Sequence, residues 1–244
     1  MMPSSDKKEI TDLCAQVRGL LQDFKHLGID EVFVQDLPSD LPRCPVGERL
    51  SGDEKMACRP ETLEEIAAEL HNCQRCPLSK RRRNVVFGVG DPNAQLVFVG
   101  EGPGREEDEK GEPFVGEAGR LLDRILSAMG LNRDQVYICN VVKCRPPGNR
   151  DPLPEEIEHC EPYLKRQLAA INPRVIVALG RFAVQTLLRD SAPVSRLRGE
   201  WREYEGIALM PTFHPAFLLR NPAMKREVWE DMKQVLHRLR ELRS

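Results

Sequence analysis

The sequence predicts an α/β domain of three layers (α/β/α) around a mostly parallel, four-stranded central sheet. From residue 61 onward, short runs rich in valine and isoleucine alternate with helical patterns. These runs lack the alternation of a half-exposed strand, so helices are expected to cover both faces of the sheet. Each run is followed by a helical pattern, which is typical of parallel strands.

The chain before residue 61 is predicted to form an N-terminal extension, helical in one part and disordered in the rest. Residues 9–27 carry apolar side chains at helical spacing, which indicates one amphipathic helix. Residues 35–59 are rich in proline and polar residues and cannot bury enough apolar surface to offset the entropy of ordering. We therefore divide the chain into an extension, residues 1–60, and an α/β domain, residues 61–244. Three cysteines of the extension match no pattern: Cys14, Cys44 and Cys58.

Within the α/β domain, a helix at residues 62–71 comes first and leads into a Cys-Gln-Arg-Cys turn. Strands are predicted at residues 96–99, 136–142, 175–179 and 207–210. Further helices are predicted at residues 117–129, 154–170, 182–188 and 225–242. Because ligands gather at the carboxyl ends of parallel strands, the loops that follow the strands are where a functional site is expected.

Composition excludes several classes of protein. Charged residues make up 30% of the chain and the net charge is −2, so there is no overall basic character. No stretch has the apolar length of a membrane span, and the N-terminus lacks the apolar core of a signal peptide. We therefore expect a cytoplasmic protein in a reducing compartment, where clustered cysteines usually indicate metal binding or catalysis.

Four cysteines form a pattern suited to a metal site. Cys73 and Cys76 form a C-x2-C pair in a polar turn, whereas Cys144 and Cys160 follow much later in the chain. A C-x2-C turn presents two thiolates on one side of a tight loop, which is half of a tetrahedral sulfur site. Structural zinc usually takes two close pairs, and here the second pair is widely split. The pattern therefore favours an iron–sulfur cluster, with structural zinc or four cysteines packed as small apolar residues as alternatives.

The loop after the first strand, Gly100-Glu-Gly-Pro-Gly, allows a tight turn and a close approach of the backbone to a ligand. It lacks both the G-x-G-x-x-G and the G-K-[ST] signature of phosphate sites. The acidic run at residues 106–108 would also repel a phosphate. Taken alone, the loop supports a structural turn and a ligand site about equally.

Five segments together resemble the type 4, iron–sulfur-containing uracil-DNA glycosylases. They are Gly100-Glu-Gly-Pro-Gly, Glu-Pro-Phe-Val-Gly-Glu-Ala-Gly at residues 112–119, Asn140-Val-Val-Lys-Cys-Arg-Pro-Pro, Asn149-Arg-Asp-Pro and His214-Pro-Ala-Phe-Leu-Leu-Arg. The resemblance extends from about residue 62 to about residue 239 and includes the spacing of the four cysteines. It implies hydrolysis of uracil from DNA in base-excision repair, and a [4Fe-4S] cluster held by Cys73, Cys76, Cys144 and Cys160.

The resemblance also implies a substrate site. Asn140 would read the polar edge of uracil, since a carboxamide both donates and accepts, and Phe114 would stack on the base. Gly100 and Gly102 would form the loop beside the base. Ordinary core packing is the alternative for Phe114, although its glycine- and proline-flanked loop favours a site.

Two residues are expected to carry the chemistry. His214 would donate a hydrogen bond to the departing base, on which negative charge develops. Glu101 would serve the sugar cation and the attacking water, either as general base or by orienting the water. The best-known uracil glycosylases carry an aspartate at the position of Gly102, so Glu101 is the expected substitute.

Contacts with DNA are expected beside this site. Lys143 and Arg145 flank Cys144, close to a basic run at residues 80–83. Leu218, Leu219 and Arg220 follow the histidine and could wedge into the duplex where the base leaves. Solvated surface and loop packing are the respective alternatives.

Uracil-containing DNA is the expected partner of a monomeric enzyme, and the acidic extension could bind a further protein. The alternative function is a non-catalytic DNA-binding or replication-associated module that kept the fold and the cluster. A pure binder has no need of Glu101, Phe114, Asn140 and His214 together, so their presence favours the enzyme.

Overall fold

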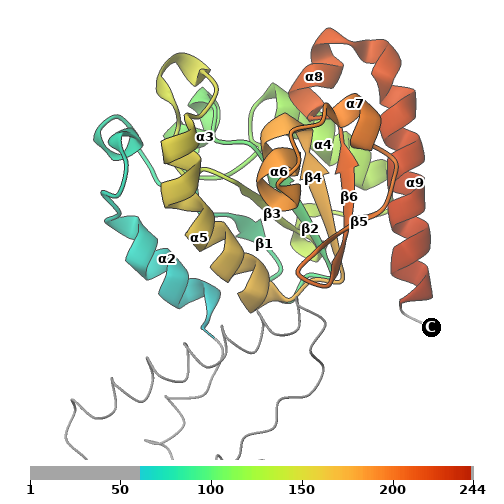
Figure 1. Ribbon diagram of the computed structural model, residues 1–244, viewed down its shortest axis with the longest axis horizontal. Helices are drawn as coiled ribbons and strands as arrows, with labels where there is room; N and C mark the ends of the chain where they lie inside the picture. The colour runs from blue at the N-terminus through green and yellow to red at the C-terminus, as the bar shows by residue number, and fades with distance from the viewer. Residues whose placement is uncertain (1–60, 243–244) are drawn as a thin grey trace, which may run out of the picture. The chain divides into compact units, whose positions relative to one another are not determined.

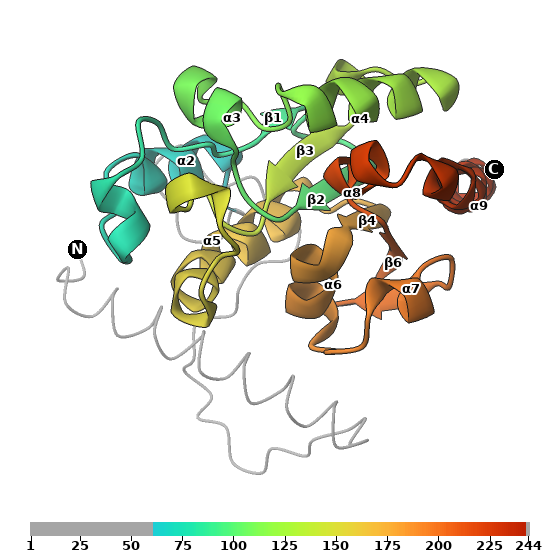
Figure 2. The same cartoon turned by 90° about the horizontal axis from the view of Figure 1, so that it is seen from above.

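The computed structural model describes residues 61–242, in which a six-stranded sheet lies between two helical layers (Figures 1 and 2). The strand order is β1-β3-β2-β4-β6-β5. Four parallel strands form its centre: β2 (Leu96–Gly100), β3 (Tyr137–Asn140), β4 (Val175–Leu179) and β6 (Ile207–Thr212). The predicted α/β/α class is confirmed, whereas the expectations for residues 1–60 lie outside the described residues.

Two short antiparallel strands extend the four that the sequence predicts. β1 (Val89–Gly90) pairs with β3, and β5 (Arg202–Tyr204) pairs with β6. Neither contains an apolar run, and two of the three residues of β5 are exposed. Backbone pairing with a neighbouring strand sustains both, so no side-chain pattern could have predicted them.

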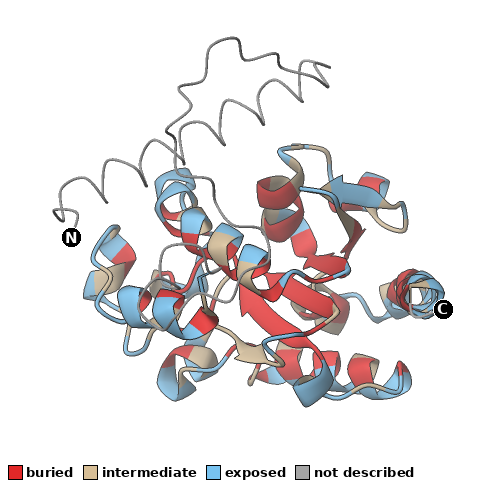
Figure 3. Ribbon diagram, turned by 90° about the horizontal axis from the view of Figure 1, so that it is seen from below, coloured by how far each residue is buried: buried red, intermediate tan, exposed pale blue. Residues whose placement is uncertain are grey.

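Side chains of successive residues in the central strands pack against opposite helical layers. Val97 faces one layer, made of α2 (Leu63–His71), α5 (Pro154–Ile171), α6 (Gly180–Leu188) and α7 (Val194–Leu197). Phe98 faces the other, made of α4 (Glu117–Ala128), α8 (Pro215–Arg220) and α9 (Lys225–Glu241). Every position of β2, β3 and β4 and the last four positions of β6 are buried, which Figure 3 shows as a red centre, and this explains the unbroken apolar runs.

The loops at the carboxyl edge of the sheet contain short helices that the sequence analysis did not predict. α3 (Arg105–Lys110) follows β2 and has the sequence Arg-Glu-Glu-Asp-Glu-Lys, with no apolar face. The 3₁₀ turn η4 (Pro147–Asn149) follows β3, and α8 follows β6. Within residues 61–242, no helix is both long and apolar enough to cross a bilayer.

Candidate active site and cysteine group

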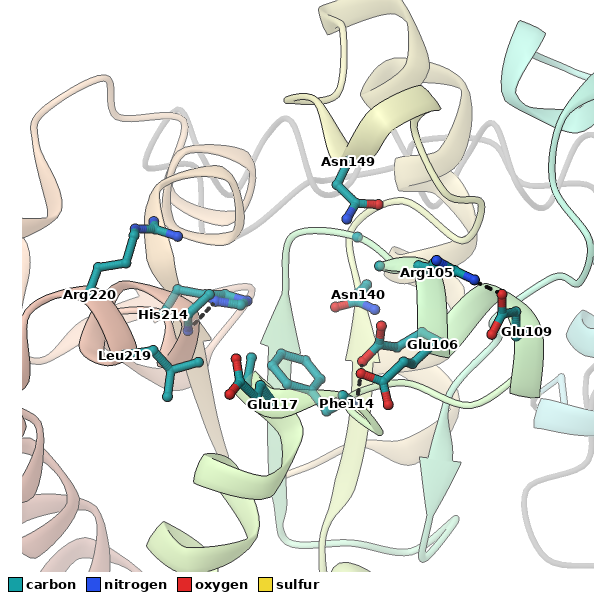
Figure 4. Close-up of a pocket in the computed structure, with 16 residues that line it drawn as sticks. Arg105, Glu106, Glu109, Phe114, Glu117, Asn140, Asn149, His214, Leu219 and Arg220 are labelled. Atoms are coloured by element: carbon teal, nitrogen blue, oxygen red, sulfur yellow. Dashed lines mark hydrogen bonds and ion pairs between the residues drawn. The ribbon is translucent and has the colours of Figure 1, made fainter.

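A cavity of about 730 Å³ opens at the carboxyl edge of the sheet (Figure 4). Its walls come from the loops after β2, β3 and β6 and from the first turn of α4. Five of the residues expected in the functional site line it: Gly102, Phe114, Asn140, His214 and Arg220. Parallel strand order thus brings together side chains that are far apart in the sequence.

Phe114 lies in the cavity between the side chains of Asn140 and His214 (Figure 4). Its ring stacks on the imidazole of His214 with 5.4 Å between the ring centroids and 29° between the planes. Its φ of 54° is in the left-handed region, which non-glycine residues rarely adopt. The ring is therefore placed by an unusual backbone conformation and not by core packing alone.

Two glycines make room for this ring and for the neighbouring carboxamide. A Cβ atom at Gly100 would lie 2.4 Å from Asn140 Oδ1 and 2.6 Å from Phe114 Cζ. A Cβ atom at Gly119 would lie 1.8 Å from the Phe114 carbonyl oxygen. Any side chain at either position would therefore displace the cavity floor.

Asn140 ends β3 and is 2% exposed. Among the described residues, nothing donates a hydrogen bond to its Oδ1 atom. Leaving such a buried acceptor without a partner costs about 1–3 kcal/mol. The carboxamide is therefore suited to a ligand that offers a donor and an acceptor side by side.

His214 occupies the N-cap position of α8, where its Nδ1 atom accepts a hydrogen bond of 3.1 Å from the backbone N–H of Ala216. A ring nitrogen that accepts carries no proton, so the neutral imidazole carries its proton on Nε2. Burial lowers the pKa of His214 to about 4, and Arg220 lowers it further while Glu107 opposes the shift. Near pH 7 the imidazole is therefore neutral and donates through Nε2.

Glu101 follows β2 and lies half-buried beside the cavity, outside the set of residues that line it. Burial raises the pKa of its carboxyl group to about 7, and the nearby Asp151 raises it too, while Arg181 lowers it. Asp151 and Arg181 form an ion pair of 2.6 Å with each other. The carboxyl group of Glu101 therefore changes charge near neutral pH.

Several residues that line the cavity had no role predicted from the sequence. Asn149 presents a carboxamide to the cavity (Figure 4). Its Oδ1 atom accepts a hydrogen bond of 2.6 Å from Arg145 Nε. Asn149 is the first residue of one of the five motifs, and its place there is the feature of the sequence that could have predicted a role in the site. Acidic side chains also line the wall: Glu106, Glu107, Glu109 and Glu117. Their charge favours an uncharged ligand over a phosphate.

The model of the uracil DNA glycosylase superfamily matches residues 87–233. The chain belongs to this superfamily. A type-4 uracil-DNA glycosylase of Archaeoglobus fulgidus is 48% identical over 183 residues, which cover 72% of this chain and 92% of that protein. The type-4 enzyme of Thermotoga maritima is 46% identical over 183 residues, 73% of this chain and 95% of that protein.

More distant members of the superfamily match as well. A type-5 uracil-DNA glycosylase of Pyrobaculum aerophilum is 30% identical over 208 residues, which cover 72% of this chain and 91% of that protein. The higher identity to the type-4 proteins confirms the resemblance predicted from the five motifs.

Two of the DNA contacts predicted from the sequence, those of Lys143 and Leu218, are wrong, because both side chains are buried. Lys143 is fully buried, and its Nζ atom donates a hydrogen bond of 2.7 Å to the carbonyl oxygen of Asn140. Burial also lowers the pKa of this ammonium group. Lys143 therefore supports the backbone at the end of β3 and does not reach a phosphate.

Leu218 is the second correction, because it is 1% exposed and packs in the core beneath α8. The next residue, Leu219, lines the cavity instead (Figure 4). Of the remaining candidates for DNA contact, Arg145 and Leu219 are half-buried and Arg220 is exposed.

The four cysteines of the expected sulfur site approach one another in space. Burial raises the pKa of the Cys144 thiol, and the nearby thiols of Cys76 and Cys73 raise it further. Burial likewise raises the pKa of Cys160, with contributions from Cys144 and Cys76. Charge effects of this kind act over several ångströms, so α5 and the loops around η2 (Pro77–Lys80) and after β3 lie near one another here.

Two hydrogen-bond donors lie beside these sulfur atoms. Arg82 Nη1 lies 3.3 Å from Cys144 Sγ, and the backbone N–H of Lys143 lies 3.2 Å from Cys160 Sγ. Donors aimed at sulfur suit thiolate ligands, whose sulfur atoms accept hydrogen bonds. Within residues 61–242, no group of three or more His, Cys, Asp or Glu side chains has the geometry of a metal site. The four cysteines and the donors beside their sulfur atoms are of the kind that holds a cluster, whereas the positions of the sulfur atoms do not form the geometry of a metal site.

Proposed function

We propose that this chain hydrolyses the N-glycosidic bond of uracil in DNA, releasing uracil and leaving an abasic site for base-excision repair. The observation that carries the proposal is the unpartnered carboxamide oxygen of Asn140, buried beside Phe114 and His214 in one cavity. Relatives that are 46–48% identical over most of the chain bear the name of this activity.

The cavity suits a uracil base turned out of the helix. Uracil presents an N3–H donor beside its O4 acceptor, which match the Oδ1 acceptor and the Nδ2 donor of Asn140. Cytosine places an amino donor where uracil has O4, and this donor would meet Nδ2. The Phe114 ring would stack on the base, and the acidic wall would keep phosphates outside the cavity.

Bond cleavage would place negative charge on uracil and positive charge on the sugar. We assign the Nε2–H of neutral His214 to the developing uracil oxyanion, because a preorganised donor stabilises charge in the transition state. We assign the Glu101 carboxylate to the sugar cation and the water, and Asn149 lies where its carboxamide could hold that water. The water oxygen bonds to C1′ and the water gives up one proton, the C1′–N1 bond breaks with its electron pair going to uracil, and uracil takes up one proton.

Glu101→Gln is expected to slow single-turnover excision about a hundredfold at pH 8, in the lower range for a lost acid–base group. The wild-type rate should rise as the pH increases through about 7, because only the ionised carboxylate stabilises the positive charge that develops on the sugar. The variant should lack this rise. A pH–rate profile of both proteins checks this, and a rise retained in the variant would assign the titration to another group.

The raised pKa of Glu101 also predicts how the stability of the fold depends on pH. Its folded-state pKa is raised, so its protonated form stabilises the fold and this contribution is lost as the pH increases through about 7. Glu101→Gln should therefore unfold at a higher temperature than the wild type at pH 8 and at a similar one at pH 4.

We also propose that Cys73, Cys76, Cys144 and Cys160 hold a [4Fe-4S] cluster, with structural zinc as the alternative. Such a cluster would join loops that are distant in the sequence and hold Arg82 of the basic run near the DNA-binding edge. This role is structural and requires no electron transfer.

Anaerobically purified protein is expected to be brown and to contain much more iron than zinc. Cys144→Ala should lose the colour and lower the melting temperature by about 10 °C, since a few kcal/mol corresponds to such a shift in a domain of this size. Cys139→Ala is the matched control, because Cys139 is equally buried but lies in β3. Colourless protein with one zinc per chain would establish zinc in place of the cluster.

Arg145 and Arg220 are proposed to contact the DNA backbone at the mouth of the cavity. We further propose a cytoplasmic monomer in which residues 1–60 form a separate extension, available to a protein partner. A non-catalytic DNA-binding module remains the alternative function. Alkaline cleavage of a uracil-containing oligonucleotide after incubation with the protein distinguishes the two, since only an enzyme generates abasic sites.

A further inference from the structure

The backbone of the loop that carries Phe114 is held from two sides by charged side chains. Arg133 donates from Nη1 to the Pro113 carbonyl oxygen at 3.1 Å and from Nη2 to the Phe114 carbonyl oxygen. On the other side, Glu107 Oε1 accepts from the backbone N–H groups of the next two residues, Val115 at 3.0 Å and Gly116 at 2.9 Å. Four successive residues thus have a backbone group bonded to one of two side chains.

This loop needs such support because of its conformation. A non-glycine residue in the left-handed region costs about 1–3 kcal/mol and persists only where its surroundings hold it. Phe114 has a φ of 54°, and relaxation toward an extended or right-handed backbone would swing its ring out of the cavity. The planar fork of a guanidinium group is suited to two adjacent carbonyl oxygens, which a lysine could not bind together.

Arg133 is itself held in place. It lies in the 3₁₀ turn η3 (Arg133–Gln135), and its Nε atom donates a hydrogen bond of 2.6 Å to Asp123 Oδ1 of α4. Its side chain is 25% exposed, and neither residue lines the cavity. Both also lie outside the five motifs that carry the family resemblance. All three guanidinium nitrogen atoms of Arg133 therefore donate hydrogen bonds, one to Asp123 and two to the Phe114 loop, outside the set of residues that line the cavity.

We propose that Arg133, oriented by Asp123, is a positioning residue that fixes the Phe114 backbone and thereby presents the ring to uracil. The inference rests on the proposed function, in which Phe114 stacks on the base. It assigns to Arg133 a contribution to base binding and to the rate that passes entirely through Phe114. A merely structural arginine would contribute whether or not the ring were present.

A double-mutant cycle tests this assignment. Arg133→Met is expected to slow single-turnover excision about 30-fold and to weaken inhibition by free uracil about tenfold, because a misplaced reactant costs up to about a hundredfold. Arg133→Lys should recover part of both losses, since it can bond one of the two carbonyl oxygens. Arg124→Met, which removes an exposed arginine from α4, is the matched control and should leave both quantities unchanged.

In a Phe114→Ala background, Arg133→Met should change the rate and the uracil inhibition less than about threefold. Equal losses in both backgrounds would overturn the inference and leave the proposed function intact. A Phe114→Ala protein with wild-type rate and uracil inhibition would remove the ring from the site and overturn the inference, whereas only a wild-type protein that generates no abasic sites would overturn the proposed function. If Arg133→Met does not fold, Asp123→Asn enters the same cycle, because it releases the guanidinium from an exposed carboxylate.

Discussion

His214→Ala is expected to slow single-turnover excision of uracil by about a hundred- to a thousandfold, the usual effect of removing one oxyanion donor. The affinity for DNA should stay nearly unchanged, because the half-buried imidazole lines the cavity and, in the proposed function, contacts the base and not the phosphates. Single-turnover kinetics and a binding titration on the same oligonucleotide measure the two quantities separately.

Two variants separate the donor role of His214 from its role at the end of α8. Asparagine is a good N-cap residue, so His214→Asn should keep the bond to the Ala216 N–H yet lose the Nε2 donor. It should therefore be about as slow as His214→Ala but more stable. His237→Ala removes an exposed histidine from α9 and serves as the control.

The low pKa of His214 gives this prediction a pH signature. Because the pKa is about 4, the imidazole stays neutral throughout the neutral range, so a loss of rate from its protonation is expected only near pH 4. A His214→Ala protein that loses DNA binding but keeps the chemical rate would show that the residue positions the DNA and does not stabilise the leaving group.

Asn140→Asp is expected to lower the preference for uracil over cytosine by at least about a thousandfold. A site built to hydrogen-bond a substrate discriminates by about 10⁴–10⁵, and the substitution replaces the Nδ2 donor with an acceptor. That acceptor would repel uracil O4 and attract the amino group of cytosine. Single-turnover rates on otherwise identical uracil and cytosine oligonucleotides measure the ratio.

Asn140→Ala is the matched comparison, since it removes the base-reading group without adding a repulsive one. Its uracil rate should fall, but without any gain on cytosine. Both variants change a buried side chain, so their unfolding temperatures must be measured alongside. Unchanged uracil excision by Asn140→Asp would remove Asn140 from the site.

The candidate site was only partly predictable. The motifs located Asn140, Phe114 and His214. Asn140 ends β3 and His214 follows β6, so the topology of a parallel sheet brings both to one edge, whereas Phe114 comes from the loop between α3 and α4. Lys143 and Leu218 lie in the same motifs, and nothing local distinguished them from surface residues. The buried position of Lys143 against the Asn140 carbonyl group and of Leu218 beneath α8 became visible only in three dimensions.

By itself, the sequence determined the α/β/α class, the four central strands and the superfamily, since these depend on periodic burial and on short contiguous motifs. Only the tertiary structure decided the edge strands, the near-neutral pKa of Glu101, the tautomer of His214 and the fork of Arg133 on the Phe114 loop. Each of these depends on burial or on a partner that is distant in the sequence. Such contacts form when the chain folds, and local patterns carry no record of them.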